Sequence, residues 1–331
     1  MADLRYTLVW ETTDDNLLPN NTGTPTINQG INLPGGAIDE IIIRYTAGTV
    51  ATGAIMNGAD SVINSARFIL NGSTFFDFRA GYSDTSDTTA ASFGYFLNSL
   101  GDGRYVEVPS DTSKDATFRI PCGRNIPSGV SRLEFTIQYA QLQAAMTTNT
   151  GSLQVWIRYN ANMTDSTYVG AATSYTHAAN SEELVIVRLP QGVPGTLAGV
   201  YVQNDSDADQ LTSVRIVSQS DYSLPLNMIR ALNGDTYNGV LYAQDGATTV
   251  GLTQMYISQD SPGNLFIPLL GLQLSDDLRL QVLGDTATTR TYTPVITAPV
   301  KGVGAPAASQ TQAVRSNTAS SVLSATDIVT G

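Results

Sequence analysis

The chain has 331 residues, only 14% of them charged, and carries a formal net charge of −12 at pH 7. That length is more than one ordinary domain needs and is comfortable for two, each able to bury its own core. No apolar run approaches the roughly 20 residues of a transmembrane helix, and the fifteen arginines are scattered beside only two lysines. We therefore expect neither a membrane-spanning helix nor direct sequence-specific nucleic-acid binding, which requires a basic stripe that displaces phosphate counterions.

The first ten residues contain neither the basic region nor the apolar stretch of a secretory signal. Cys122 is the only cysteine, so the chain cannot form an internal disulfide. Both features favour a protein that is made and kept in a reducing compartment.

Alternating apolar and polar residues predict β-strands throughout the first half. At 4–10 the alternation places Leu4, Tyr6, Leu8 and Trp10 on one face, which we expect to be buried. The residues from 13 to 37 are expected to form a long loop. Further strands are predicted at 41–45, 66–70, 74–78, 105–108, 117–120, 133–139 and 153–159.

One short helix is predicted within this series of strands. Phe93, Phe96, Leu97 and Leu100 have helical spacing, and Gly101 can end the helix. A counterpart in the second half is expected around Leu226, Ile229 and Leu232, after Leu224-Pro225. The second half also carries candidate strands at 184–189, 199–203, 213–218, 240–243, 252–257, 265–267, 278–282 and 291–296.

Two short patterns recur at nearly the same separation. Ile120-Pro121 is repeated as Ile267-Pro268, 147 residues later, and the strand bearing Arg67 resembles the strand bearing Arg215, 148 residues later. A constant offset indicates tandem domains of one fold, and duplicated β domains without catalytic residues usually build larger structures.

The predicted fold is all-β: two tandem eight-stranded jelly-roll β-barrels, each with a short helix, plus an extended C-terminal tail. An immunoglobulin-like pair stays open as an alternative. The expected domains are a first jelly roll at 1–160, an interdomain connection at 161–182, a second jelly roll at 183–299 and the tail at 300–331. The tail is too polar to fold alone, so we expect neighbouring subunits to hold it.

Few residues suggest chemistry. His177 is the only histidine, and its place in the polar connection favours an exposed linker residue over a catalytic base. Cys122 is expected to be a small buried hydrophobe. Asp205, Asp207 and Asp209 alternate like the start of a calcium loop, but Gln210 stands where such a loop needs glycine. They stay weak candidates for a structural cation; no catalytic site and no cofactor is predicted.

The duplicated halves, with their matching Arg-bearing and Ile-Pro strands, resemble the double-jelly-roll major capsid proteins of tailless icosahedral viruses, the tectivirus, corticovirus and adenovirus lineage that includes bacteriophages. The resemblance covers about residues 4–299. It implies a homotrimer that forms a pseudohexagonal capsomer of an icosahedral shell. It also implies contacts with neighbouring capsomers, with minor capsid or penton proteins and, in many members, an internal membrane. The implied location is the virion, with assembly in the host cytoplasm.

Two other classes of protein remain alternatives. A surface adhesin or fibre subunit would show an export signal or a donor strand. A carbohydrate-active β-sandwich protein would show two close carboxylates and aromatic platforms, whereas the chain has only Trp10 and Trp156 as tryptophans.

Overall fold

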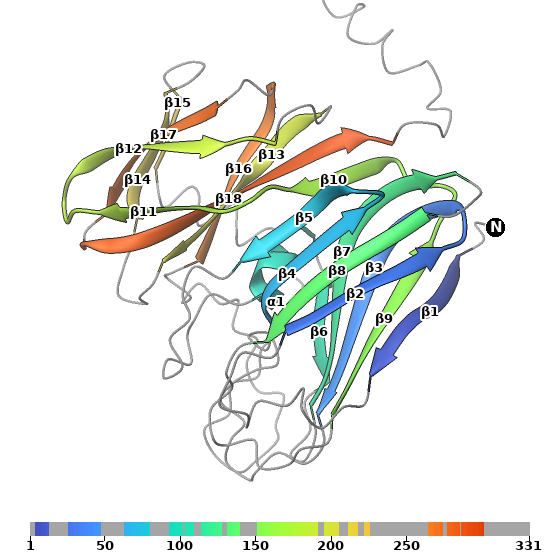
Figure 1. Cartoon of the computed structure of the whole chain (residues 1–331). Coiled ribbons are helices and arrows are strands. Elements are labelled where there is room, and N and C mark those ends of the chain that lie inside the picture. The colour runs from blue at the N-terminus through green and yellow to red at the C-terminus, as the bar shows by residue number, and fades with distance from the viewer. Residues whose placement is uncertain are drawn as a thin grey trace, which may run out of the picture.

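The computed structural model describes segments from both halves of the chain, and these segments form strands and one helix (Figure 1). The described residues are 4–12, 26–47, 63–79, 93–101, 103–108, 114–127, 131–139, 151–190, 195–204, 211–217, 222–225, 264–273, 277–284 and 286–300.

The described residues of the first half form nine strands and a helix. They are β1 (Arg5–Thr12), β2 (Thr26–Leu33), β3 (Gly36–Ala47), β4 (Ile63–Leu70), β5 (Ser73–Arg79), α1 (Phe93–Ser99), β6 (Tyr105–Val108), β7 (Lys114–Ile126), β8 (Ser131–Tyr139) and β9 (Gly151–Tyr159). The second half contributes β10 (Asp165–Val169), β11 (Thr173–His177), β12 (Glu182–Arg188), β13 (Thr196–Asn204), β14 (Leu211–Ile216), β15 (Tyr222–Pro225), β16 (Asn264–Gln273), β17 (Asp277–Gly284) and β18 (Thr288–Pro299).

The first set of strands has the hydrogen-bonded order of a jelly roll. One sheet runs β1-β9-β3-β7, with the short β6 added at the edge, and the facing sheet runs β2-β8-β4-β5. With β6 left out and the other eight strands renumbered in chain order, the two sheets have the strand orders 1-8-3-6 and 2-7-4-5. The first and last strands are then neighbours. The predicted antiparallel pairing of β1 with β9 is confirmed, with Tyr6 opposite Arg158 and Leu8 opposite Trp156.

The second set repeats that order. Strands β10 and β11 both pair with β18 and together act as the first strand, followed by β13 and β16 in the same sheet. The facing sheet runs β12-β17-β14-β15. This is again 1-8-3-6 opposite 2-7-4-5, so the chain carries two jelly rolls of the same topology.

The two repeated sequence patterns lie on equivalent strands. Ile120 is on the sixth strand of the first set and pairs with Ile41, while Ile267 is on the sixth strand of the second set and pairs with Val200. Arg67 and Arg215 are both on fourth strands and are both exposed. The strand orders thus place both pairs as the duplication predicts.

Some sequence-based expectations were wrong. The expected loop at 13–37 contains β2, which is the second strand of the first jelly roll. The connection expected at 161–182 contains β10 and β11, and β15 takes the place where the second helix was expected to start. β10, β11 and β15 are short, and polar residues and a glycine interrupt the alternation in β2, so a search for alternation misses them. The expected helix at 226–232, the strands at 240–243 and 252–257 and the tail after Val300 lie outside the described residues.

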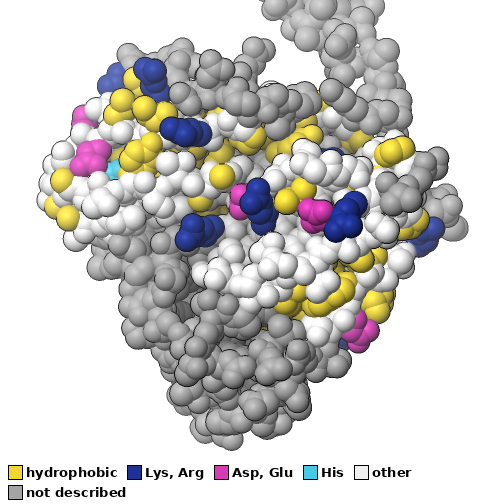
Figure 2. All heavy atoms as spheres, viewed as in Figure 1, with side chains coloured by type: hydrophobic (Ala, Val, Ile, Leu, Met, Phe, Trp, Pro, Cys, Tyr) yellow, Lys and Arg dark blue, Asp and Glu magenta, His cyan; other side chains and the backbone are white. Residues whose placement is uncertain are grey.

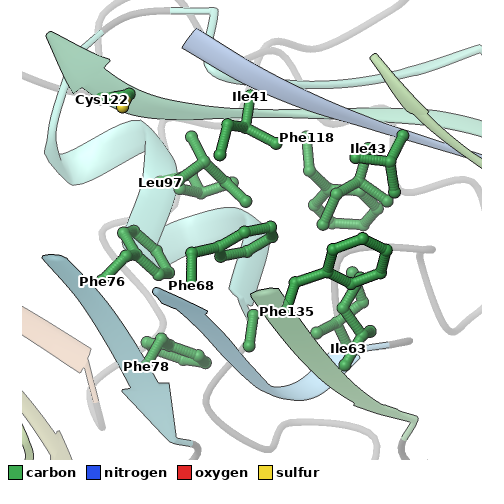
Figure 3. Packing of buried hydrophobic residues seen from close by; sticks show 14 of the residues in the cluster. Ile41, Ile43, Ile63, Phe68, Phe76, Phe78, Leu97, Phe118, Cys122 and Phe135 are labelled. Carbon is green, nitrogen blue, oxygen red and sulfur yellow. The ribbon is translucent and has the colours of Figure 1, made fainter. Parts of the chain in front are cut away.

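Aromatic side chains fill the first core (Figure 3). The predicted helix α1 is confirmed and lays Phe93, Phe96 and Leu97 against the strands, all fully buried. The ring of Phe96 stacks on Phe78 with 4.7 Å between centroids, and Phe93 stacks on Phe118 at 5.4 Å. Burying such rings contributes on the order of 2 kcal/mol each, so this core stabilises the first barrel strongly.

The described residues of the second core are mainly aliphatic. Its buried residues include Val185 and Val187 of β12, Leu280 of β17 and Ile296 of β18. Each barrel therefore has its own hydrophobic core, as expected for two domains.

Candidate assembly surfaces and the seam between the barrels

The two barrels are joined through one sheet. Strand β10 of the second set pairs antiparallel with β18 and also makes a parallel bridge to β5 of the first set, Val169 opposite Phe76. The sheets of the two barrels thus continue into each other across this seam (Figure 1). Tyr201 of β13 adds a contact from the second barrel, because its buried ring lies 5.0 Å from Phe96 of α1.

Arg124 at the end of β7 holds β10 in place. Its guanidinium lies 3.8 Å from the centre of the Tyr168 ring, donates to the carbonyl of Thr167 at 3.1 Å and donates to the carbonyl of Cys122 at 2.5 Å. A planar, always charged group can stack and donate hydrogen bonds at once, which a lysine ammonium cannot do in this geometry.

Gly123, next to Arg124, permits the close approach of the two strands. Its φ of 62° lies in the left-handed region that favours glycine. A Cβ at this position would overlap the carbonyl of Asp165, and the Ser166 hydroxyl donates to the Gly123 carbonyl. Sequence reasoning missed both seam residues, because an isolated Gly-Arg pair after Pro-Cys has no diagnostic spacing.

The outer face of the β1-β9-β3-β7 sheet carries a charged network centred on Glu40. Arg119 donates two hydrogen bonds to its carboxylate, at 2.9 and 3.1 Å. Arg104 and Arg158 each add an ion pair at 3.1 Å, and Arg158 also pairs with Asp39. Three guanidinium groups thus share two carboxylates, and Glu40 is only 4% exposed although it lies on the outer face of a sheet.

Exposed large apolar side chains gather on two edge strands. On β1 and just before it, Leu4, Tyr6 and Leu8 are 52%, 53% and 38% exposed. On β12, Leu184 and Ile186 are 53% and 37% exposed. The sequence predicted the first three as core residues, which is wrong: a β-bulge between Leu8 and Trp10 turns Trp10 into the core while the three earlier residues face outward.

By contrast, the outer face of the β2-β8-β4-β5 sheet presents paired charges (Figure 2). Arg132 contacts Glu134 at 2.7 Å and Arg67 lies 3.8 Å from Asp77. Exposed pairs of this kind contribute about 0 to 1 kcal/mol each to folding stability. Their main effect is to make this face polar.

His177 is buried, which corrects the expected exposed linker residue. It ends β11 inside the second barrel, with its Nδ1 2.8 Å from the Glu183 carboxylate and its Nε2 3.1 Å from the Tyr292 hydroxyl. Both contacts suit the neutral ring, which donates from Nδ1 and accepts at Nε2. Burial and the nearby Arg290 guanidinium lower the pKa of His177, although Glu183 opposes this shift.

Of the remaining sequence candidates, Cys122 lies in the described part of the chain. Cys122 is buried as predicted, and burial raises the pKa of its thiol to about 12, so thiolate is scarce at neutral pH. Asp205, Asp207 and Asp209 lie outside the described residues. Within the described part of the chain, three or more potential metal-ligating side chains do not come together. No helix in that same part is both long and apolar enough to span a membrane.

Comparison with known proteins finds similarity in structure alone. Neither the protein-family models nor the curated protein sequences contain a match to the chain. The STIV MCP matches with a TM-score of 0.51 and 12% identity over 89% of this chain and 97% of that protein. The PBCV-1 virus capsid matches with a TM-score of 0.50 and 9% identity over 92% and 96% of the two chains. The major capsid protein P2 of bacteriophage PM2 has a TM-score of 0.49 at 12% identity, over 89% and 97%.

The first two of these matches span both barrels and nearly the whole length of the other proteins. Because the identities are low, they show a shared fold and nothing beyond it. The repeated strand order and the seam are the features of this chain that make up that fold. The chain has the double-jelly-roll fold of viral capsid proteins.

Proposed function

We propose that the protein is the major capsid protein of an icosahedral virus, a structural subunit without catalytic activity. The observation that carries this proposal is the repeated strand order 1-8-3-6 opposite 2-7-4-5, placed twice in one chain. Two similar barrels in one chain make a homotrimer of six barrels pseudohexagonal, and such a tile can pave a closed shell.

The buried cores and the polar surface of the protein both suit a shell subunit. The two cores and the seam stabilise the two-barrel subunit, since they bury aromatic and aliphatic side chains in each barrel. Contacts between tiles have to form reversibly during assembly, which favours modest interfaces with a polar rim. The exposed ion pairs of the β2-β8-β4-β5 face suit such a surface.

We place the subunit in the virion, after assembly in the host cytoplasm. Its partners are two further copies of itself, neighbouring capsomers, and minor capsid or penton proteins, with an internal membrane beneath in the lineage that it resembles. We place the boundary between the barrels at residues 160–164, because β9 closes the first strand set and β10 opens the second. The C-terminal tail, from residue 300, is proposed as an assembly device.

Electron microscopy of the purified protein tests the proposal. Class averages of negatively stained particles should show a three-fold object with a pseudohexagonal outline. Particles with the outline of a single elongated two-barrel molecule at micromolar concentration would contradict the capsomer assignment.

A further inference from the structure

The two exposed apolar stripes lie on different barrels, at opposite ends of the molecule (Figure 1). The first, the β1 stripe, consists of Leu4, Tyr6 and Leu8. The second, the β12 stripe, consists of Leu184 and Ile186. One chain cannot bring its own two stripes together, so a contact between them has to join two copies. Unlike patches that pair in this way form a heterologous interface, which closes into a ring when the rotation between copies allows it.

The β1 stripe has a defined order of charges along the strand. Tyr6 is opposite Arg158, whose guanidinium belongs to the network around Glu40, in which arginines outnumber carboxylates. Beyond Leu8, Glu11 is exposed on the same face, where Gln154 donates to its carboxylate at 3.3 Å. Along β1 the stripe is therefore apolar from Leu4 to Leu8, with Arg158 beside its middle residue Tyr6, and it is followed by acidic Glu11. Trp156 lies beside Leu8 and widens the apolar part.

The β12 stripe carries a charged residue at each end. Exposed side chains alternate with the core residues of this strand in the burial pattern eieBeBe, so Glu182, Leu184, Ile186 and Arg188 share the outer face. From the N-terminal end of β12 the stripe runs acidic, apolar, basic. When β1 of one copy packs with its outer face on the outer face of β12 of another and the strands run parallel, apolar meets apolar, Glu11 meets Arg188, and Glu182 lies toward the end of the stripe nearer Arg158.

The backbone of β12 argues for a contact through side chains. The Tyr175 hydroxyl donates to the carbonyl of Ile186 at 2.6 Å and accepts from its N–H at 3.2 Å. This contact occupies the free edge of β12 in its middle, where an added strand would have to bind. A partner therefore meets β12 on its outer face, where Leu184 and Ile186 lie.

We infer that the β1 stripe of one subunit packs on the β12 stripe of the next, and that this repeated contact closes the trimer. The inference rests on the proposed capsomer function and names the surfaces that would build it. Tyr, Trp and Arg around Leu8 are the residue types that dominate binding energy at protein interfaces, and the stripes would form the apolar centre of the contact with a charged rim.

A disulfide trap tests the contact in the full-length protein. Because the native Cys122 is buried, a variant with Leu8→Cys and Ile186→Cys has two accessible thiols. Treated with oxidised glutathione, it should give a band of three cross-linked chains on a non-reducing gel, while each single variant should stay monomeric. The control pairs Ile186→Cys with Val106→Cys, since Val106 is also exposed but lies on β6, at the other edge of the sheet. This control should give no covalent trimer.

Light scattering on the same samples separates the inferred contact from the capsomer proposal. A protein that is trimeric but gives no cross-linked trimer, or that gives dimers from Leu8→Cys alone, would overturn the inferred contact and leave the capsomer proposal standing. A protein that is monomeric at all concentrations would overturn both.

Charge reversal supplies an independent readout. Glu11→Arg and Arg188→Glu should each raise the trimer dissociation constant about fivefold, because each puts like charges together. Combining them in one chain should restore most of the affinity, since the reversed ends again match. Glu134→Arg on the β8 face should have no effect. Losses that simply add in the double variant would contradict the paired arrangement.

Discussion

At Gly123 the absence of one side chain allows β7 to contact β10. The backbone there has a positive φ, and the space where a Cβ would project is filled by the Asp165–Ser166 backbone of the second barrel. Residue 123 therefore has to adopt a left-handed backbone conformation and to leave room for the β10 backbone. Either would favour glycine, and together they leave no room for another residue.

We predict that Gly123→Ala destabilises the protein by about 3 kcal/mol, combining the conformational cost with the displacement of β10. The matched control is Gly72→Ala. Gly72 also has a positive φ, of 79°, but nothing lies within 4 Å of the position that its Cβ would take, so only the conformational cost of about 1 kcal/mol applies. Urea denaturation measures both. Equal losses at the two sites would show that the seam tolerates a methyl group.

His177 makes the second barrel sensitive to acid. Its folded-state pKa is lowered by burial and by Arg290 from a reference value of 6.5, and the pKa of Glu183 is also lowered, chiefly by a hydrogen bond from the Ala178 N–H. A lowered folded pKa means that the unfolded chain binds the proton more readily. The stability from His177 is therefore complete above about pH 6.5 and is lost as the pH falls.

We predict that the melting temperature of the wild type falls between pH 7.5 and pH 5 more steeply than that of His177→Gln. The variant should be less stable at pH 7.5, because Glu183 and Tyr292 lose their shared partner, yet its curve should be flatter. Thermal melts at half-unit intervals of pH give both curves. Parallel curves would mean that other groups, such as the carboxylates, determine the acid sensitivity.

At the scale of elements, the Glu40 network ties three strands of one sheet face together. Glu40 is on β3, Arg119 is on β7 and Arg158 is on β9. The side chains of the two arginines are 32% and 18% exposed, so water screens part of their charge, whereas the Glu40 side chain is 5% exposed. Removing the buried carboxylate would leave the guanidinium groups without their common partner.

We predict that Glu40→Gln costs about 2 kcal/mol of unfolding free energy, less than for a fully buried pair because the arginines keep some contact with water. Glu134→Gln removes one partner of an exposed pair with Arg132 and should cost less than about 1 kcal/mol. The same urea titration compares the two variants. If both lose the same amount, the network does not tie the strands together.

The elements that the sequence predicted are those with strong alternation and one clear face. Strands β8 and β9 and helix α1 follow the expected pattern, because apolar residues at period 2 or 3.6 face a core on one side only. Strands β10 and β11 escaped prediction because each has five residues and most of their side chains are polar. Their order depends on partners more than a hundred residues away in β18, which local patterns cannot reveal.

At β1 the alternation predicted a buried face that the structure leaves exposed, and the reason concerns assembly. A periodic apolar face predicts burial but not the partner that buries it. In β1 the apolar residues before the bulge face away from the core of the chain. Within a larger assembly that same periodicity would be satisfied by another subunit, as the inferred contact with β12 would do.

For the whole molecule, the duplication was predictable because two separate patterns shared one offset. The strand orders of the two sets agree with it at Ile120 and Ile267 and at Arg67 and Arg215. The candidate surfaces were not predictable, since Glu40, its arginines and the two stripes come together only when the sheets form. The seam likewise depends on a parallel bridge between β5 and β10 that nothing in the sequence pattern indicates.

We predict that deleting residues 305–331 leaves a folded trimer that fails to form complete shells. The segment is rich in Ala, Ser, Thr and Gln, so it lacks the apolar surface to fold alone and should gain order only from contacts between subunits. Assembly of wild type and truncated protein with their partner capsid proteins, followed by sedimentation and electron microscopy, compares them. Shells of normal size from the truncated protein would exclude an assembly role for the tail.

The mass of the purified protein in solution tests the central claim most directly. The chain has a mass of 35.1 kDa, and a closed ring of three copies would have a mass of about 105 kDa. Size-exclusion chromatography with multi-angle light scattering, at concentrations from about 1 to 50 μM, should give that value or the larger mass of assembled particles. A mass of one chain across this range would contradict the account of the protein as a capsomer-forming subunit.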